Sequence, residues 1–365
     1  MLSSGIPTEK RHLPLFLASG LFCLLLGSYA GLHRLGLPLP GAWAGFHGPL
    51  MVCGFLGTLI GLERAVHLGS RWALLVPLSA FLGALSLLAG HAAWALGLWL
   101  WLFSAIMHLG VFLKGHFPLK LPEDLLSVCG LLCWLISLFF WLEGHPLREI
   151  SVALLFFPLL TILAERWPGA TAKLKMGGGI TLGCGLGLSA LLLFLLPNPD
   201  LPLRLSGVCL MGAGLFLSWQ ERPLKTTLSA GQKREQGWEL YLERVMVMSY
   251  GWLSLSGLLF LLLGEQGLRE PFYDLLIHGL SLGFILGVIF SHFYKVLKAL
   301  LGADLPFYQS YYLPWGLLQA GLLLRAYGKV GEHPQLWQIG GSLNVLALLL
   351  FLGLVARALQ RGLAT

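Results

Sequence analysis

Residues 46–66 read FHGPLMVCGFLGTLIGLERAV, an apolar run with a histidine at one end and a carboxylate–guanidinium pair at the other. Polar and charged side chains are costly inside a membrane and mark functional positions there. On an α-helix the side chains of Met51 and Gly54 return to roughly the face of His47. Small residues on such a face admit a neighbouring helix or a flat cofactor at close range. The stretch therefore predicts either helix packing around a hydrogen-bonded histidine or a metal-ligating histidine above a smooth groove.

The composition indicates a membrane protein. The chain has 365 residues, of which 56% are hydrophobic and 11% are charged, and its mean hydropathy is +0.78. An average soluble domain is less apolar and carries about 25% charged residues. Apolar runs of about 20 residues cross the hydrocarbon core of a bilayer as helices. We therefore expect an all-α, polytopic integral membrane protein, with residues 1–365 forming a single transmembrane domain.

Apolar runs of this length predict about twelve transmembrane helices. Their ranges are 13–34, 44–66, 72–90, 92–113, 123–142, 149–165, 177–196, 203–220, 241–264, 271–297, 308–327 and 336–357. The first run follows Lys10 and Arg11, as the apolar part of a signal peptide does, but we expect it to remain as a span. Residues 221–243 form the only sizeable polar segment. We expect them to form a cytoplasmic loop with a short interfacial helix.

The basic residues predict the orientation in the membrane. Eighteen of the 24 Lys and Arg residues fall on the side that holds both expected termini. The six on the other side are Arg34, Arg148, Arg204, Arg269, Arg325 and Lys329. Because cytoplasmic loops carry the excess of Lys and Arg, we expect both termini in the cytoplasm and the protein in the inner (cytoplasmic) membrane. The net charge of +7 then follows from the topology and needs no nucleic acid as a partner.

Two histidines fall at similar depth in the predicted spans. His47 lies near the start of the second span and His278 near the start of the tenth. Both spans are even-numbered and run from outside to inside, so two imidazoles near the outer face could hold one haem iron from opposite sides. His292 lies about 21 Å further along the tenth helix and cannot share this iron. For His292 we weigh a polar cluster, a second metal, and a second haem held together with His108.

Acidic–basic pairs recur at the ends of three spans, in the sequences TLIGLER, TILAER and SWQER. Because adjacent residues of a helix point about 100° apart, we expect Glu63, Glu165 and Glu221 to pair with arginines of neighbouring helices. An interhelical ring of ion pairs and a proton path are the two interpretations. The chain contains no nucleotide-binding loop, and its six cysteines all fall inside predicted spans. Small apolar cysteines of this kind need no redox role.

The span count, the HGxxM sequence from His47 to Met51 and the histidine of the tenth span resemble the catalytic subunit of haem-copper oxidases and nitric oxide reductases. The chain is similar in kind to the NnrS family of haem-containing membrane proteins, which are associated with nitric oxide stress. The resemblance implies a low-spin haem ligated by His47 and His278. It further implies a role in electron transfer or in nitric oxide metabolism, with a quinol or another redox partner.

The chain also departs from those oxidases. Its sixth span has no histidine or tyrosine, its seventh has no His-His pair, and Leu280 stands where the oxidases carry the histidine of the high-spin haem. We therefore expect neither copper nor an oxygen-reducing centre, and any catalysis on nitric oxide to be slow or to depend on a partner. One non-covalent haem b per chain is the expected cofactor, because no CxxCH attachment sequence occurs.

The expected haem site contains His47 and His278 as ligands, with Met51 and Gly54 beside the ring. The haem propionates are expected to face outward and to meet an arginine, since a guanidinium matches a carboxylate in two hydrogen bonds. Arg325, at the outer end of the eleventh span, is the first choice, and the others are Arg34 and Arg204. The alternative function is a cofactor-free secondary transporter of a small solute. The sequence leaves the substrate, the electron donor and the formation of a homo-oligomer open.

Overall fold

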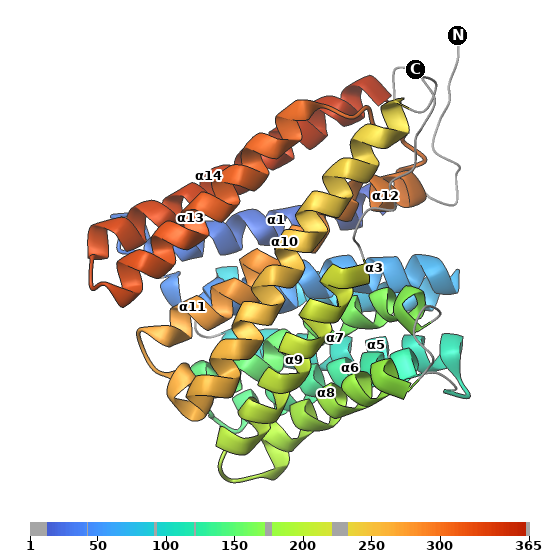
Figure 1. Cartoon of the computed structure of the whole chain (residues 1–365). Coiled ribbons are helices and arrows are strands. Elements are labelled where there is room, and N and C mark those ends of the chain that lie inside the picture. The colour runs from blue at the N-terminus through green and yellow to red at the C-terminus, as the bar shows by residue number, and fades with distance from the viewer. Residues whose placement is uncertain are drawn as a thin grey trace. The chain divides into compact units, whose positions relative to one another are not determined.

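The computed structural model describes residues 13–41, 43–90, 93–119, 122–171, 177–220 and 233–362 (Figure 1). These residues form helices and contain no β-strand, which confirms the all-α class. The chain forms two compact units, unit 1 (Met1–Pro202) and unit 2 (Leu203–Thr365). The single transmembrane domain over residues 1–365 stays a prediction.

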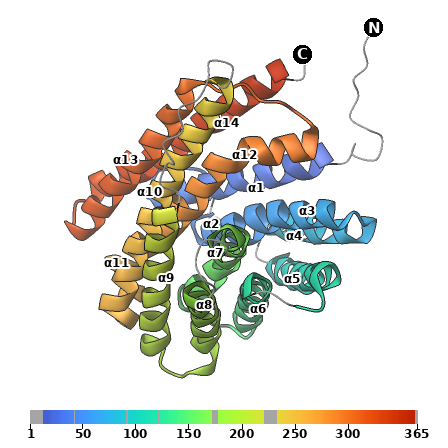
Figure 2. The same ribbon diagram turned by 45° about the vertical axis from the view of Figure 1, so that its right-hand side comes forward.

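The described part of unit 1 contains a series of apolar helices. They are α1 (Leu13–Arg34), α2 (His47–Pro49), η3 (Leu50–Leu56), α3 (Gly57–Leu68), α4 (Leu75–Ser86), α5 (Trp94–His116), α6 (Pro122–Leu142), α7 (Leu147–Thr171) and α8 (Gly177–Leu195). Helix α4 packs against α5, and α6 packs against α7 and α8, which Figure 2 shows side by side. Trp101, Trp134 and Phe157 are completely buried. These large side chains fill the interior of unit 1.

Unit 2 contains the remaining long helices. They are α9 (Asp200–Gln220), which begins at the boundary of the units, α10 (Lys233–Leu263), α11 (Phe272–His278), η9 (Gly279–Leu286), α12 (Gly287–Leu301), α13 (Tyr312–Val330) and α14 (Pro334–Gly362). Helices α13 and α14 form a closely packed pair (Figure 1). A Cβ atom at Gly340 would lie 2.7 Å from the carbonyl oxygen of Gly321. Glycines on the two facing surfaces thus let the backbones approach.

Among the described residues, ten segments are long and apolar enough to cross a membrane. They correspond to ten of the twelve runs expected from the sequence. The other two runs coincide with α8, whose apolar part Leu182–Leu195 is short, and with α13, which carries Arg325 and Lys329. The described helices therefore fit a multi-pass membrane protein, while the count of twelve spans stays a prediction.

Helix α10 begins earlier than hydropathy suggests. It starts at Lys233, inside the segment expected as a loop, and residues 221–232 lie outside the described residues. Trp238 is buried, and its indole N–H donates a hydrogen bond to the carbonyl oxygen of Leu305 at 3.2 Å. Packing of this kind stabilises helix in a polar sequence that hydropathy alone assigns to a loop. Residues 233–243 are thus the first turns of α10.

An ion pair joins α3 to α7 in unit 1. Arg64 Nη2 lies 2.7 Å from Glu165 Oε1, which confirms for Glu165 that the pairing runs between neighbouring helices. Glu221, the third expected member of the set, lies outside the described residues. The side chains of the pair are 15% and 38% exposed, so its contribution to stability is about 1 kcal/mol or less.

Candidate functional site

Among the described residues, each unit has one long helical segment in which a π-helix interrupts the α-helix. In unit 1 the segment Ala44–Leu68 contains the π-helix η3, and in unit 2 the segment Phe272–Leu301 contains the π-helix η9. We call these two segments the interrupted helices. A π-helix has i→i+5 hydrogen bonds, is rare, and is frequent at functional sites. The two interrupted helices are therefore candidate positions for a functional site.

The two interrupted helices share their sequence landmarks. His47 stands at the start of α2, directly ahead of η3, and His278 is the last residue of α11, directly ahead of η9. A glycine follows each histidine. Both segments end at a glycine in the left-handed conformation, Gly69 with φ 66° and Gly302 with φ 70°. Glycine adopts this conformation without steric cost and ends helices in this way. The same order of histidine, glycine, π-helix and left-handed glycine therefore occurs in both interrupted helices.

The imidazole of His47 is oriented by α1. Its Nδ1 lies 2.8 Å from the carbonyl oxygen of Gly27. Because a carbonyl oxygen only accepts, Nδ1 donates this hydrogen bond and the lone pair of the neutral ring lies on Nε2. Gly31 makes room for the ring, since a Cβ atom there would lie 2.9 Å from Nδ1. Metal-ligating histidines characteristically have their second nitrogen fixed by such a bond.

The imidazole of His278 is oriented in the same way by its own helix. Its Nδ1 lies 2.8 Å from the carbonyl oxygen of Asp274, one turn earlier, and 3.5 Å from the Oδ1 atom of the same residue. The side chain of His278 is 12% exposed. The bond to the carbonyl again places the lone pair on Nε2. Both histidines expected from the sequence as haem ligands therefore have the tautomer that an axial ligand requires.

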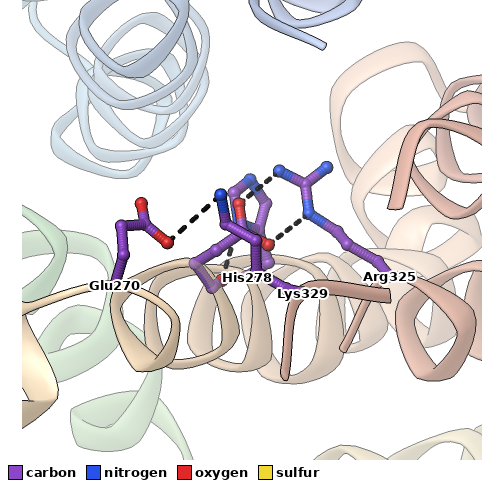
Figure 3. Close-up of polar contacts among 5 residues, drawn as sticks. Glu270, His278, Arg325 and Lys329 are labelled. Carbon is purple, nitrogen blue, oxygen red and sulfur yellow. Dashed lines mark hydrogen bonds and ion pairs between the residues drawn. The ribbon is translucent and has the colours of Figure 1, made fainter. Parts of the chain in front are cut away.

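Asp274 forms a buried ion pair with Arg325, which Figure 3 labels together with His278. Arg325 on α13 donates from Nε to Oδ2 and from Nη2 to Oδ1 of Asp274, each at 2.7 Å. The side chains are 9% and 8% exposed. A second pair, Lys329 Nζ and Glu270 Oε2 at 3.3 Å, lies beside the first and is more exposed. The two pairs together tie the start of the interrupted helix of unit 2 to α13.

The structure also locates the three arginines expected near haem propionates. Arg204 on α9 donates from Nη1 to the carbonyl oxygens of Leu261 at 2.8 Å and Leu262 at 3.1 Å. Arg34 is the last residue of α1. Arg325 is joined through Asp274 to His278, but its guanidinium already has a carboxylate partner within unit 2. A propionate contact of any of the three stays a prediction.

Asp274 is the residue of this cluster that sequence analysis missed. It lies inside an apolar run, where an acidic side chain is costly unless it pairs with a basic group. It also precedes His278 by four residues, a spacing that places both side chains on one face of a helix. These two signals were present in the sequence. Its partner Arg325 lies 51 residues further along the chain, and no local sequence pattern links the two.

Met51 and Gly54 lie within η3, beside residues of neighbouring helices. A Cβ atom at Gly54 would lie 3.3 Å from the Cβ of Cys23 on α1 and 3.2 Å from the Cβ of Ala84 on α4. The thioether of Met51 lies beside Gly27, where a Cβ atom would be 2.7 Å from Sδ. The small size of Gly54 therefore serves helix packing in unit 1. Contacts of Met51 and Gly54 with a haem stay predictions.

The two deeper histidines have different surroundings. His292 on α12 is buried, and its Nδ1 lies 2.6 Å from Ser291 Oγ and 3.2 Å from the carbonyl oxygen of Val288. His108 on α5 is buried with its ring edge-on to Trp134, at a centroid distance of 6.1 Å. Within the described part of the chain, no group of three or more His, Cys, Asp or Glu side chains could hold a metal ion. A bis-histidine haem takes only two protein ligands, so this finding does not bear on it.

The fold and these residues define a multi-pass helical protein with one histidine-bearing interrupted helix in each of two units. Residues 12–360 match the model of a family described as "Domain of unknown function (DUF8744)", and the chain belongs to this family. The comparison with curated proteins found no match, and the comparison with solved structures found none either.

Proposed function

We propose that this protein is a b-type haem-binding membrane protein with a role in electron transfer or in nitric oxide metabolism. His47 and His278 supply the two axial ligands of one non-covalent haem. The observation that carries this proposal is their shared local geometry: each precedes a π-helix, and each has Nδ1 at 2.8 Å from a backbone carbonyl oxygen.

The shared hydrogen bond has a chemical consequence at each histidine. It fixes the orientation of the ring, keeps the lone pair on Nε2 and makes that nitrogen a better donor to a metal. A haem with two histidine ligands exchanges single electrons and has no open iron position for a diatomic substrate. The sequence departures at the sixth and seventh spans and at Leu280 support the absence of a copper centre. Electron transfer therefore fits these residues better than oxygen reduction.

The proposed orientation places both termini in the cytoplasm. It rests on the excess of Lys and Arg on one side of the predicted spans, and it puts His47 and His278 near the outer face of the inner membrane. Electrons would then enter or leave the haem near that face. A quinol or another redox partner fits this arrangement.

A secondary transporter is the second candidate. Irregular helices form the substrate sites of many transporters, and ionisable side chains within a membrane mark such sites. The π-helix η9 with Asp274 and Arg325 beside it fits this second function. In that case the carboxylate and the guanidinium would bind a solute, and no haem would be present.

A reduced-minus-oxidised absorption spectrum of the purified full-length protein tests the proposal. The haem proposal predicts the sharp bands of a low-spin b-type haem, with about one haem per chain. Protein that is folded and monodisperse but has no haem band, even after haem supplementation during expression, would contradict it. That result would favour the transporter.

A further inference from the structure

We propose that Asp274 and Arg325 are positioning residues that control the donor strength of His278. Asp274 acts on the imidazole through its carboxylate, and Arg325 acts through Asp274. This inference rests on the proposed function only in that His278 is taken as a haem ligand. The contacts themselves lie entirely within unit 2.

The carboxylate is close enough to Nδ1 of His278 to act on it. The carbonyl oxygen of Asp274 accepts the principal hydrogen bond from Nδ1 at 2.8 Å, and the carboxylate atom Oδ1 lies 3.5 Å from the same nitrogen. An anion at this distance from the N–H group stabilises positive charge on the ring and on any metal bound at Nε2. All the side chains involved are about a tenth exposed, so water screens the interaction little.

Arg325 sets how strongly Asp274 can act. Arg325 donates one hydrogen bond of 2.7 Å to each oxygen of the Asp274 carboxylate, which fixes the plane of the carboxylate and offsets its charge. The same Oδ1 atom that lies nearest to His278 accepts the bond from Arg325 Nη2. Loss of Arg325 would leave a buried, uncompensated carboxylate free to turn toward the Nδ1–H group. The guanidinium therefore limits the effect of Asp274 on His278.

The neighbouring pair Glu270–Lys329 supplies a matched control. It joins the same two parts of unit 2, at 3.3 Å, but Lys329 and Glu270 are 26% and 44% exposed. Glu270 pairs with Lys329, whereas the carboxylate near Nδ1 of His278 is that of Asp274. Substitutions there change the charge nearby and the tie to α13 without touching the imidazole.

The test measures the haem midpoint potential in the full-length Asp274→Asn, Arg325→Gln and double variants. Asp274→Asn should raise the potential, because a negative charge beside the ligand is lost. Arg325→Gln should lower it, and the lowering should be smaller when Asp274 is already Asn, because Arg325 then has no carboxylate to restrain. The single substitutions Glu270→Gln and Lys329→Gln should have smaller effects.

Two results would overturn the inference: an unchanged potential in Asp274→Asn, or an equal lowering by Arg325→Gln in both backgrounds. The second result would instead support a direct propionate contact of Arg325. If one single variant fails to fold because it leaves a buried charge unpaired, the neutral double variant keeps the comparison with the wild type possible.

A readout without haem separates this inference from the proposed function. In haem-free protein labelled with ¹⁵N-histidine, Asp274→Asn should shift the Nδ1–H resonance of His278 upfield, and Glu270→Gln should leave it in place. If the wild type binds no haem, the proposed function fails, but this resonance still decides whether Asp274 acts on His278. An Nδ1–H resonance that does not move in Asp274→Asn would refute the inference.

Discussion

At the scale of single residues, backbone carbonyls hold the two candidate ligands. Gly27 on α1 accepts from His47, and Asp274 accepts from His278 with its backbone oxygen. Substituting the residue that bears either carbonyl would keep the hydrogen bond. The space around the ring is a better target for mutation, and at His47 that space depends on Gly31.

Replacing Gly31 by alanine should displace the imidazole of His47. The added Cβ would lie 2.9 Å from Nδ1 and 3.0 Å from Cε1, closer than van der Waals contact allows. We expect the protein to lose about 1–3 kcal/mol of stability by overpacking and to lose most of its haem. Thermal unfolding and the haem-to-protein absorbance ratio measure the two effects.

Gly110→Ala is the matched control on α5. A Cβ atom there has no described heavy atom within 4 Å, so alanine should stabilise the helix by about 0.5–1 kcal/mol and leave the haem content unchanged. Wild-type haem content in Gly31→Ala would count against the placement of His47.

The sequence predicted the candidate ligands but not what surrounds them. His47 and His278 stood out because imidazoles are rare in apolar runs. The bidentate hydrogen bonds between Arg325 and Asp274 depend on how α11 packs against α13. No local sequence pattern predicts that packing. The spacing between Asp274 and His278 was visible in the sequence, since four residues make one helical turn.

At the scale of elements, glycines determine how the interrupted helix of unit 2 packs. Gly279, Gly283 and Gly287 recur every four residues and face α10. A Cβ atom at Gly279 would lie 2.9 Å from Ser256 Oγ, and one at Gly283 would overlap the side chain of Trp252. Small residues at this spacing allow two helix backbones to approach closely. The π-helix η9 is thus pressed directly against α10.

Replacing Gly283 by alanine should therefore destabilise unit 2. The overlap with Trp252, a large and buried ring, should cost about 1–3 kcal/mol. Gly316→Ala on α13 has no described atom within 4 Å of the added Cβ and should be neutral or slightly stabilising. Thermal unfolding in detergent distinguishes the two variants. Equal unfolding temperatures would show that η9 does not pack on α10 in this way.

The π-helices themselves could not be predicted from the sequence. Hydropathy and α-helical periodicity give the position and length of a span, but the choice between i→i+4 and i→i+5 hydrogen bonds depends on tertiary packing. The wider turn of η3 changes which residues share the face of His47, so the face calculated for an α-helix does not hold beyond Leu50. The same applies to His292, which follows η9.

At the scale of the whole molecule, the two units repeat an order of elements. Unit 1 contains α1, an interrupted helix, α4 and α5, and unit 2 contains α10, an interrupted helix, α13 and α14. Within these two sets of four elements, α1 packs on η3 and α10 packs on η9, while α4 packs on α5 and α13 packs on α14. Helices α6–α9 have no place in this shared order. The sequence predicted the spans well because hydropathy sums over many residues.

The proposed orientation makes a prediction for the whole chain. A fluorescent protein that folds only in the cytoplasm, fused after Thr365, should be fluorescent. A membrane-impermeant maleimide should label the Gly144→Cys variant in intact cells, because the turn between α6 and α7 is expected outside. If the maleimide labels this cysteine only after the cells are opened, the turn lies in the cytoplasm and the proposed orientation is wrong.

The most direct test of the central claim is the low-spin haem absorbance per chain in four single alanine variants. His47→Ala and His278→Ala should each lose this signal, because each removes one of the two proposed axial ligands. His108→Ala and His292→Ala, which replace buried histidines assigned no ligand role in the proposed haem, should keep it. A full low-spin signal in His47→Ala or in His278→Ala would contradict the account.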